Sequence, residues 1–337
     1  MKGEKHMRMN CAFSCDDAYI QHAGVCTYSI FENNRDIEEI YIYFIDNHIS
    51  DKYKEQLHEI SESFSGDGVR KIIFVDLYEI SKELKVCTDF CRSTYGKLFM
   101  GQIEEVDRML CFDCDTVCVG SLKPLLTMDL EDATVWGVQD TVNPYFVKAI
   151  GRDSQYRYIN CGGVIVLNLK KWREMDIEQQ FVEYITEHDG NPPFVDQGTI
   201  NKLCKTGVLP PTYNVINPMF MYSVKRIKRL FKIKNYYTQS EIDDAKRNPI
   251  VIHYTGEMYN RPWCYGCNHP LKEYYLEILE KTPWARNIVD KPLSKNCKIQ
   301  NWIYYKCPFW VYLLMVRFIE IRHTFFKRSM KGDTQKK

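Results

Sequence analysis

The first half of the chain alternates short apolar runs with polar or amphipathic stretches. Apolar runs that predict β-strands occupy residues 11–15, 39–46, 71–76 and 108–112. The stretches between them predict helices over residues 19–31, 51–64 and 94–103. Strands that alternate with helices in this way indicate βαβ units, and therefore an α/β fold with a mainly parallel sheet flanked by helices on both faces.

The second half is less regular, although the same two patterns continue. Residues 134–140, 164–167 and 251–256 predict further strands, the last of them short. Residues 169–186 predict one amphipathic helix, because Trp172, Ile177, Phe181 and Ile185 recur at helical spacing.

Two aspartates interrupt the apolar pattern where the strand at residues 108–112 ends. Asp113 and Asp115 bracket Cys114, and a strand-like pattern resumes at residues 116–119. Like charges this close repel one another and resist burial, so folding alone gives little reason for them. Ligands of parallel sheets bind outside the carboxyl ends of the strands. We therefore expect Asp113 and Asp16, which follows the first strand, to project from the same edge of the sheet.

An Asp-x-Asp pair at a strand end suits a divalent cation bound together with a diphosphate. Side chains alternate along a regular strand, so Asp113 and Asp115 would point to opposite faces. One carboxylate would then bind the cation directly, and the other would bind it through a water molecule or after a bend at the strand end. His253 is the natural third ligand, with a packed core histidine as the alternative. Gly256 would allow close approach of a phosphate and Arg261 would bind its oxygens, unless the segment is a plain surface turn.

The cysteines offer a rival interpretation of the same stretch. Cys111, Cys114 and Cys118 are spaced like metal ligands, and Cys264 and Cys267 form a C-x-x-C pair. A structural zinc site usually needs two such pairs in one compact module, and these lie far apart in the sequence. The prediction favours buried, reduced thiols. No secretory signal is visible near the first residues, so we expect a cytoplasmic chain.

Composition narrows the class of protein. The 337 residues are 45% hydrophobic and 26% charged, as in an ordinary globular protein of one large domain with a smaller appendage. The net charge of +1 argues against a general nucleic-acid-binding surface, so no nucleic-acid partner is expected. No stretch reaches the roughly 18 uncharged apolar residues of a membrane-spanning helix.

Four segments in order, from about residue 9 to 263, carry a family resemblance. They read "AFSCDDAY", "STYGKLFMG…DRMLCFDCDTVCVGSLKPL", "YINCGGVIVLNLKKWRE" and "DQGTIN…HYTGEMYNRPW". Together they resemble glycosyltransferase family 8, of the bacterial lipooligosaccharide galactosyltransferase type, which has a GT-A fold. The resemblance implies transfer of a hexose, galactose or glucose, from a UDP-sugar to a cell-surface glycan or lipid-linked acceptor. It also implies retention at the anomeric carbon and a Mn²⁺ or Mg²⁺ cofactor.

The resemblance assigns roles residue by residue. It implies that Asp113, Asp115 and His253 hold the metal. It implies that Asp16 and the backbone at Cys114 contact the nucleoside, and that Gly256 and Arg261 bind the diphosphate. The pocket for the donor sugar would be formed by Lys97, Asn160, Asp196 and Gln197. Asp17 and Tyr19 also belong to the set that binds the UDP-sugar. Asp196 and Gln197 are also the candidates for a catalytic oxygen beside the anomeric carbon.

Several positions depart from the family pattern. Ala18 replaces an asparagine expected to contact the ribose, Lys97 stands where arginine is usual, and Gly198 replaces an acidic residue. These changes leave open a sugar-nucleotide-binding protein with little or no turnover. A cation-dependent nucleotidyltransferase is a third possibility, but the first strand is not followed by the glycine-rich phosphate loop that it would need.

The C-terminal region combines aromatic and basic residues. Residues 307–331 hold an apolar, aromatic run followed by cations, and residues 224–234 form a second basic stretch. Such patterns are typical of an amphipathic helix that lies on an anionic membrane, with a solvated or packed helix as the alternative. We expect a transferase domain over residues 9–285, a helical tail over 286–337, and peripheral contact with the inner face of the cell membrane.

Overall fold

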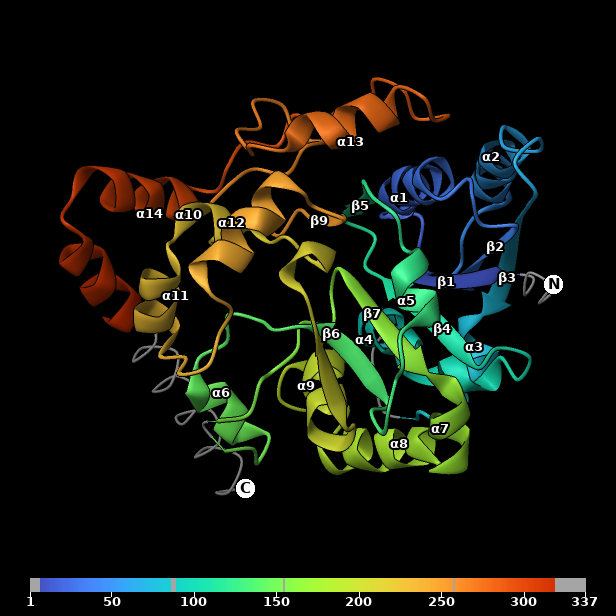
Figure 1. The fold of residues 1–337 in the computed structure, drawn as a ribbon, viewed down its shortest axis with the longest axis horizontal. Helices are drawn as coiled ribbons and strands as arrows, with labels where there is room; N and C mark the ends of the chain where they lie inside the picture. The colour runs from blue at the N-terminus through green and yellow to red at the C-terminus, as the bar shows by residue number, and fades with distance from the viewer. Residues whose placement is uncertain (1–6, 86–88, 154, 257, 319–337) are drawn as a thin grey trace, which may run out of the picture.

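Seven strands form one mixed sheet in the order β3-β2-β1-β4-β7-β6-β8 (Figure 1). The computed structural model describes residues 7–85, 89–153, 155–256 and 258–318. Neighbouring strands run parallel except at β7, which is antiparallel to β4 and β6. In chain order the strands are β1 (Arg8–Cys15), β2 (Glu39–Asp46), β3 (Val69–Asp76), β4 (Arg108–Phe112), β6 (Val135–Val138), β7 (Val164–Asn168) and β8 (Thr206–Leu209).

Side-chain alternation along the central strands builds a separate core on each face of the sheet. Phe13 and Phe112 point into one core, whereas Ala12 and Cys111 point into the other. The first core is covered by α1 (Ile20–Asn33) and α2 (Asp51–Glu62). The second core is covered by the short 3-10 segment η1 (Gly96–Gln102), α7 (Leu169–Glu174), α8 (Ile177–Glu187) and α9 (Val195–Leu203). Figure 1 shows α1 and α2 on one side of the sheet and α7, α8 and α9 on the other. The predicted α/β fold with a mainly parallel sheet is confirmed.

A second, two-stranded sheet lies at the carboxyl edge of the main one. β5 (Thr116–Cys118) pairs antiparallel with β9 (Val251–His253), and Thr116 lies opposite His253. The predicted late strand therefore pairs with the continuation of the Asp-x-Asp segment instead of joining the main sheet. The remaining helices are α3 (Leu77–Ile80), α4 (Asp89–Tyr95), α5 (Lys123–Thr127), α6 (Pro144–Ala149), η2 (Pro211–Tyr213), α10 (Asn217–Met221), α11 (Val224–Phe231), α12 (Gln239–Arg247), α13 (Lys272–Leu279) and α14 (Lys295–Lys306).

Two helix predictions were wrong in detail. The single helix predicted over residues 169–186 is two helices, because Asp176 adopts a left-handed conformation with φ of 50° and interrupts the turn between α7 and α8. The helix predicted over residues 94–103 is the end of α4 followed by η1, which has a kink at Phe99. In both places the apolar spacing was correct, but local backbone geometry changed the element.

The C-terminal segment packs against α11 and the first core. Ile303, Tyr304 and Phe309 contact that core, and the hydroxyl of the buried Tyr312 lies 2.7 Å from the hydroxyl of Tyr222. None of the helices in the described ranges combines the length and the apolar character that crossing a membrane requires. Most of the predicted basic tail, residues 319–337, lies outside the described residues.

Candidate active site

The two aspartates of the Asp-x-Asp pair and His253 come together at the carboxyl edge of the sheet. Residues 113–115 form a turn between β4 and β5, so the alternation of a regular strand does not separate the two carboxylates. The backbone N–H of Tyr254 donates to the carbonyl oxygen of Asp115 at 2.9 Å, which fixes the end of β9 beside this turn. One potential ligand atom from each of Asp113, Asp115 and His253 lies within 4.8 Å of the other two.

Basic side chains face both aspartates. The Lys97 ammonium lies 2.8 Å from Asp113 and 3.1 Å from Asp196, and the Arg261 guanidinium lies 3.1 Å from Asp115. Burial alone would raise the pKa of Asp115, but His253 and Arg261 outweigh it and lower the pKa to about 2. Burial would lower the pKa of Lys97, but its two carboxylate partners raise it well above its usual value.

The donor set fits a divalent cation. Two carboxylates and one imidazole are ligands that Mn²⁺ accepts, and the carboxylates alone would suit Mg²⁺. Gly162 packs directly against two of the three potential ligands. A Cβ at this position would lie 2.4 Å from the His253 ring and 2.7 Å from the Asp113 carboxylate. Any larger residue would push these ligands apart.

A cavity of about 300 Å³ adjoins the two aspartates of the three potential ligands. It is lined by seven of the residues predicted from the sequence, namely Asp16, Tyr19, Lys97, Asp113, Cys114, Asp115 and Asp196. Asp17 does not line it, and its carboxylate instead accepts the backbone N–H of Ser50 at 2.8 Å. The predicted meeting of Asp16 and Asp113 at one sheet edge is confirmed, because β1 and β4 are parallel neighbours with Phe13 opposite Phe112.

Arg261 and Gly256 belong to a second cavity that shares Tyr19 with the first. This cavity has a volume of about 520 Å³ and is also lined by Trp263 and Lys291. A Cβ on Gly256 would lie 3.5 Å from the Arg261 guanidinium, so the backbone at Gly256 runs beside that cation. The guanidinium also lies 5.2 Å from the centre of the Trp263 ring, which limits its movement.

The cysteine alternative finds no support. Cys111, Cys114, Cys118, Cys264 and Cys267 are free thiols with buried side chains. In the ranges that the structure describes, none of them joins a group of three potential metal ligands. Burial raises the pKa of Cys111 and Cys118 to about 12, which keeps both thiols protonated.

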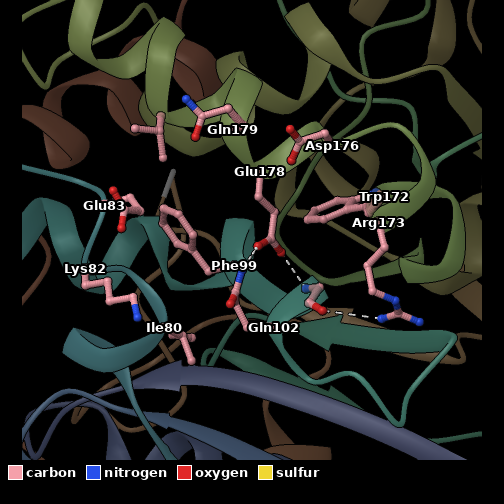
Figure 2. Close-up of a pocket in the computed structure, with 12 residues that line it drawn as sticks. Ile80, Lys82, Glu83, Phe99, Gln102, Trp172, Arg173, Asp176, Glu178 and Gln179 are labelled. Atoms are coloured by element: carbon pink, nitrogen blue, oxygen red, sulfur yellow. Dashed lines mark hydrogen bonds between the residues drawn. The ribbon is translucent and has the colours of Figure 1, made fainter.

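A further cavity, of about 270 Å³, lies among η1, α7 and α8 (Figure 2). Figure 2 shows Glu178 pointing toward Gln102, whose side-chain amide donates to it at 2.6 Å. The Glu178 carboxylate also accepts the backbone N–H of Gly101 at 2.6 Å. None of the site residues predicted from the sequence lines this cavity, so its contacts tie η1 to α8 rather than forming part of the candidate site.

The sequence model of glycosyl transferase family 8 matches residues 10–267, which include all the elements around the site. The chain belongs to this family. The segments that suggested the resemblance all lie within the matched residues, and the family 8 chain is therefore a glycosyltransferase.

Two relatives of the family 8 chain are named for different sugars, glucose and galactose. Lipopolysaccharide 1,2-glucosyltransferase of Escherichia coli K12 is 29% identical over 313 residues, covering 87% of this chain and 86% of that protein. Lipopolysaccharide 1,3-galactosyltransferase of Salmonella typhimurium LT2 is 18% identical over 309 residues, covering 86% and 83%.

Solved structures support the GT-A fold of the family 8 chain. The galactosyltransferase LgtC, in complex with donor and acceptor sugar analogs, superposes with a TM-score of 0.64 at 23% identity, covering 82% of this chain and 96% of that one. The bifunctional glycosyltransferase WbbM superposes with a TM-score of 0.69 at 20% identity, covering 84% of this chain and 51% of that one. At these identities the likeness concerns the fold alone.

The sequence did not reveal Asp140, which connects two predicted site residues of the family 8 chain, Asn160 and Gln197. The Asp140 carboxylate accepts from the Asn160 side-chain amide at 3.0 Å and from the Gln197 side-chain amide at 2.9 Å. The Gln197 oxygen in turn accepts the backbone N–H of Cys161 at 3.0 Å. Asp140 ends the predicted strand over residues 134–140, and a polar residue at a strand end was the available signal.

Proposed function

We propose that this chain transfers a hexose, galactose or glucose, from a UDP-sugar to a glycan or lipid-linked acceptor in a Mn²⁺-dependent reaction that retains the anomeric configuration. The observation that carries the proposal is the convergence of Asp113, Asp115 and His253, flanked by Lys97 and Arg261, beside a cavity at the sheet edge. Two like-charged carboxylates held this close favour a site that takes up positive charge.

Each side chain has a role in this proposal. Asp113, Asp115 and His253 would hold Mn²⁺, or Mg²⁺, and the cation would supply positive charge to the leaving diphosphate when bound. Arg261 would bind the diphosphate oxygens, with the Gly256 backbone beside them. Asp16, Tyr19 and the backbone at Cys114, which line the cavity, would bind the nucleoside.

The sugar would lie among Lys97, Asn160, Asp196 and Gln197. Lys97 holds the Asp196 carboxylate at 3.1 Å, and burial raises the pKa of Asp196 despite that contact. The Gln197 side chain is held at both ends by Cys161 and Asp140. Either oxygen could assist the positive charge that develops at the anomeric carbon, and we leave the choice between Asp196 and Gln197 open.

A panel of UDP-sugars tests the proposal. With Mn²⁺ present, we expect UDP release from one or two hexose donors, loss of release with EDTA, and loss of release in Asp115→Ala. Asp132→Ala is the matched control, because this exposed aspartate pairs with Lys171 far from the site. Release from no donor, or release that Asp115→Ala leaves unchanged, contradicts the proposal. Proton NMR of the product then reports the anomeric configuration.

We further propose that residues 286–337 contact the inner face of the cell membrane. Two exposed stripes support this: Ile299, Trp302 and Tyr305 on α14, and Trp310, Leu314 and Phe318 on residues 309–318, which are also helical. All six side chains are at least 55% exposed. Beside them, the Arg226 guanidinium of the basic helix α11 lies 4.7 Å from the centre of the Phe309 ring. Exposed aromatic side chains next to basic ones are typical of helices that bind anionic interfaces.

Vesicle co-sedimentation tests the membrane contact. We expect binding to vesicles with about 30% phosphatidylglycerol and weaker binding to pure phosphatidylcholine. Trp302→Ser, Trp310→Ser and Phe318→Ser together should abolish binding without changing UDP release. The matched control replaces three exposed tyrosines elsewhere, Tyr145, Tyr265 and Tyr274, by serine. Substitution is preferable to truncation after residue 301, which would remove the buried Tyr312. Equal loss in both triple variants contradicts the proposal.

A further inference from the structure

Asn214 lies next to the candidate metal site. Its side chain contacts both His253, a potential metal ligand, and Asn160, a predicted residue of the donor-sugar pocket. This asparagine is fully buried and follows η2, where Val215 forms a parallel bridge with Ile252 of β9. The backbone N–H of His253 also donates to the carbonyl oxygen of Val215 at 3.1 Å. The backbone thus holds Asn214 beside His253, although the two residues lie 39 positions apart in the chain.

The orientation of the Asn214 amide is fixed by its neighbours. Its nitrogen donates to the backbone carbonyl of Gly162 at 2.9 Å and to the side-chain oxygen of Asn160 at 3.0 Å. A backbone carbonyl can only accept, so the nitrogen and not the oxygen must face Gly162. The Asn160 oxygen also accepts the backbone N–H of Gly162 at 2.8 Å, which holds that acceptor in place.

The Asn214 oxygen therefore faces His253. It lies 3.2 Å from the Nδ1 atom of the imidazole, and since an amide oxygen only accepts, Nδ1 must carry a proton. The other nitrogen, Nε2, lies 3.2 Å from the Asp115 carboxylate on the side of the three potential ligands, so Nε2 is the atom that would give up its proton and offer a lone pair when a cation binds.

The same contacts form a directional chain of hydrogen bonds across the site. Asp140 accepts from Asn160, Asn160 accepts from Asn214, and Asn214 accepts from His253. The Asp140 carboxylate at one end and the Gly162 backbone in the middle allow only this direction. Gly163 makes room for it, because it adopts a φ of 74° and a Cβ there would lie 2.2 Å from the Asn214 side chain.

We propose that Asn214 is a positioning residue that fixes His253 as the Nδ1–H tautomer, with Nε2 aimed at the cation, and that holds Asn160 in the donor-sugar pocket. The proposal rests on the proposed cation site. Groups that orient a ligating histidine in this way commonly change metal affinity by about 10- to 100-fold when they are removed. Asn214 itself contacts neither the cation nor the sugar in this scheme.

Two variants separate the acceptor contact of Asn214, to His253, from its two donor contacts, to Gly162 and Asn160. Asn214→Leu removes all three hydrogen bonds, so Mn²⁺ affinity measured by calorimetry without UDP-sugar should fall about 10- to 100-fold. Asn214→Asp keeps an acceptor for His253 but loses both donors, so Mn²⁺ affinity should stay within about threefold while KM for the donor sugar rises. Asn34→Leu is the matched control: Asn34 is equally buried, and its side chain contacts Ile30, Leu122 and Cys118, none of which is a proposed ligand of the cation or the sugar nucleotide. It should lower stability and leave Mn²⁺ affinity unchanged.

NMR of the ¹⁵N-labelled imidazoles reads directly whether Nδ1 carries a proton in the metal-free wild type. We expect a protonated Nδ1 for the signal that disappears in His253→Gln, and a shift of the proton toward Nε2 in Asn214→Leu. An Nε2–H tautomer in the wild type overturns the proposal even if no variant folds. A folded Asn214→Leu protein with wild-type Mn²⁺ affinity also overturns it. Wild-type protein that binds no Mn²⁺ would instead contradict the proposed function and leave the tautomer result standing.

Discussion

Two pairs of aspartates follow two neighbouring parallel strands, and the structure treats them differently. Asp16 and Asp17 follow β1 and are half-buried or exposed, and their carboxylates accept backbone N–H groups of Ala18 and Ser50. Asp113 and Asp115 follow β4, and charged groups face each of them. Aspartate pairs that look alike in the sequence, each at the end of a strand, therefore differ in their chemical environment because different segments pack against them.

The strongest test of this comparison is Asp115→Asn. The substitution preserves the shape of the side chain but removes the charge that faces His253 and Arg261. We expect UDP release in the presence of Mn²⁺ to fall by more than about 100-fold, because one of three ligands to the cation is lost. Initial rates at saturating donor measure the effect, and a loss of less than tenfold would remove Asp115 from the proposed ligand set.

Gly162→Ala tests whether close packing maintains the Asp113–His253 arrangement. The new Cβ would overlap the His253 ring and the Asp113 carboxylate, so we expect Mn²⁺ affinity to fall about tenfold or more. Gly66→Ala is the control, because a Cβ there meets no atom within 4 Å. Calorimetric titration of both variants with Mn²⁺ measures the difference, and equal affinities would show that the ligand cluster tolerates movement.

Asp16→Asn tests the other pair. Asp16 lines the cavity but contacts no basic side chain that the structure records, so its proposed role is to bind the nucleoside. We expect KM for the UDP-sugar to rise about tenfold, as for one lost charge-assisted hydrogen bond, with kcat changed less than about threefold. A kcat loss comparable with that of Asp115→Asn would abolish the distinction between the two pairs.

The dependence of stability on acid pH tests the contacts of Asp115. The pKa of Asp115 is about 2, below its ordinary value of 3.8, so the folded state favours the ionised form. The stabilisation is complete above 3.8 and is lost as the pH falls through about 2. Between pH 4 and 2, the metal-free wild type should lose on the order of 2 kcal/mol more unfolding free energy than Asp115→Asn does. Urea titrations at both pH values measure this loss, and parallel pH profiles would contradict the assigned pKa.

The site could be predicted in part because its motifs lie in local sequence. The apolar run before Asp113 fixes the strand, and the turn residues after it fix the strand end. Asp140 and Asn214 were missed because an isolated polar residue in the sequence does not reveal its partners. Asn214 gains its role from contacts with Gly162 and His253, which are 52 and 39 positions away.

The sequence by itself determined the α/β class, the order of the elements and the family, because apolar periodicity and contiguous motifs are properties of neighbouring residues. Only the tertiary structure decided that β9 pairs with β5 and brings His253 to Asp115, and that the helix predicted over residues 169–186 breaks at Asp176. It also decided the direction of the hydrogen bonds from Asp140 to His253. These features depend on contacts between segments distant in the chain and on backbone conformations that residue type alone does not fix.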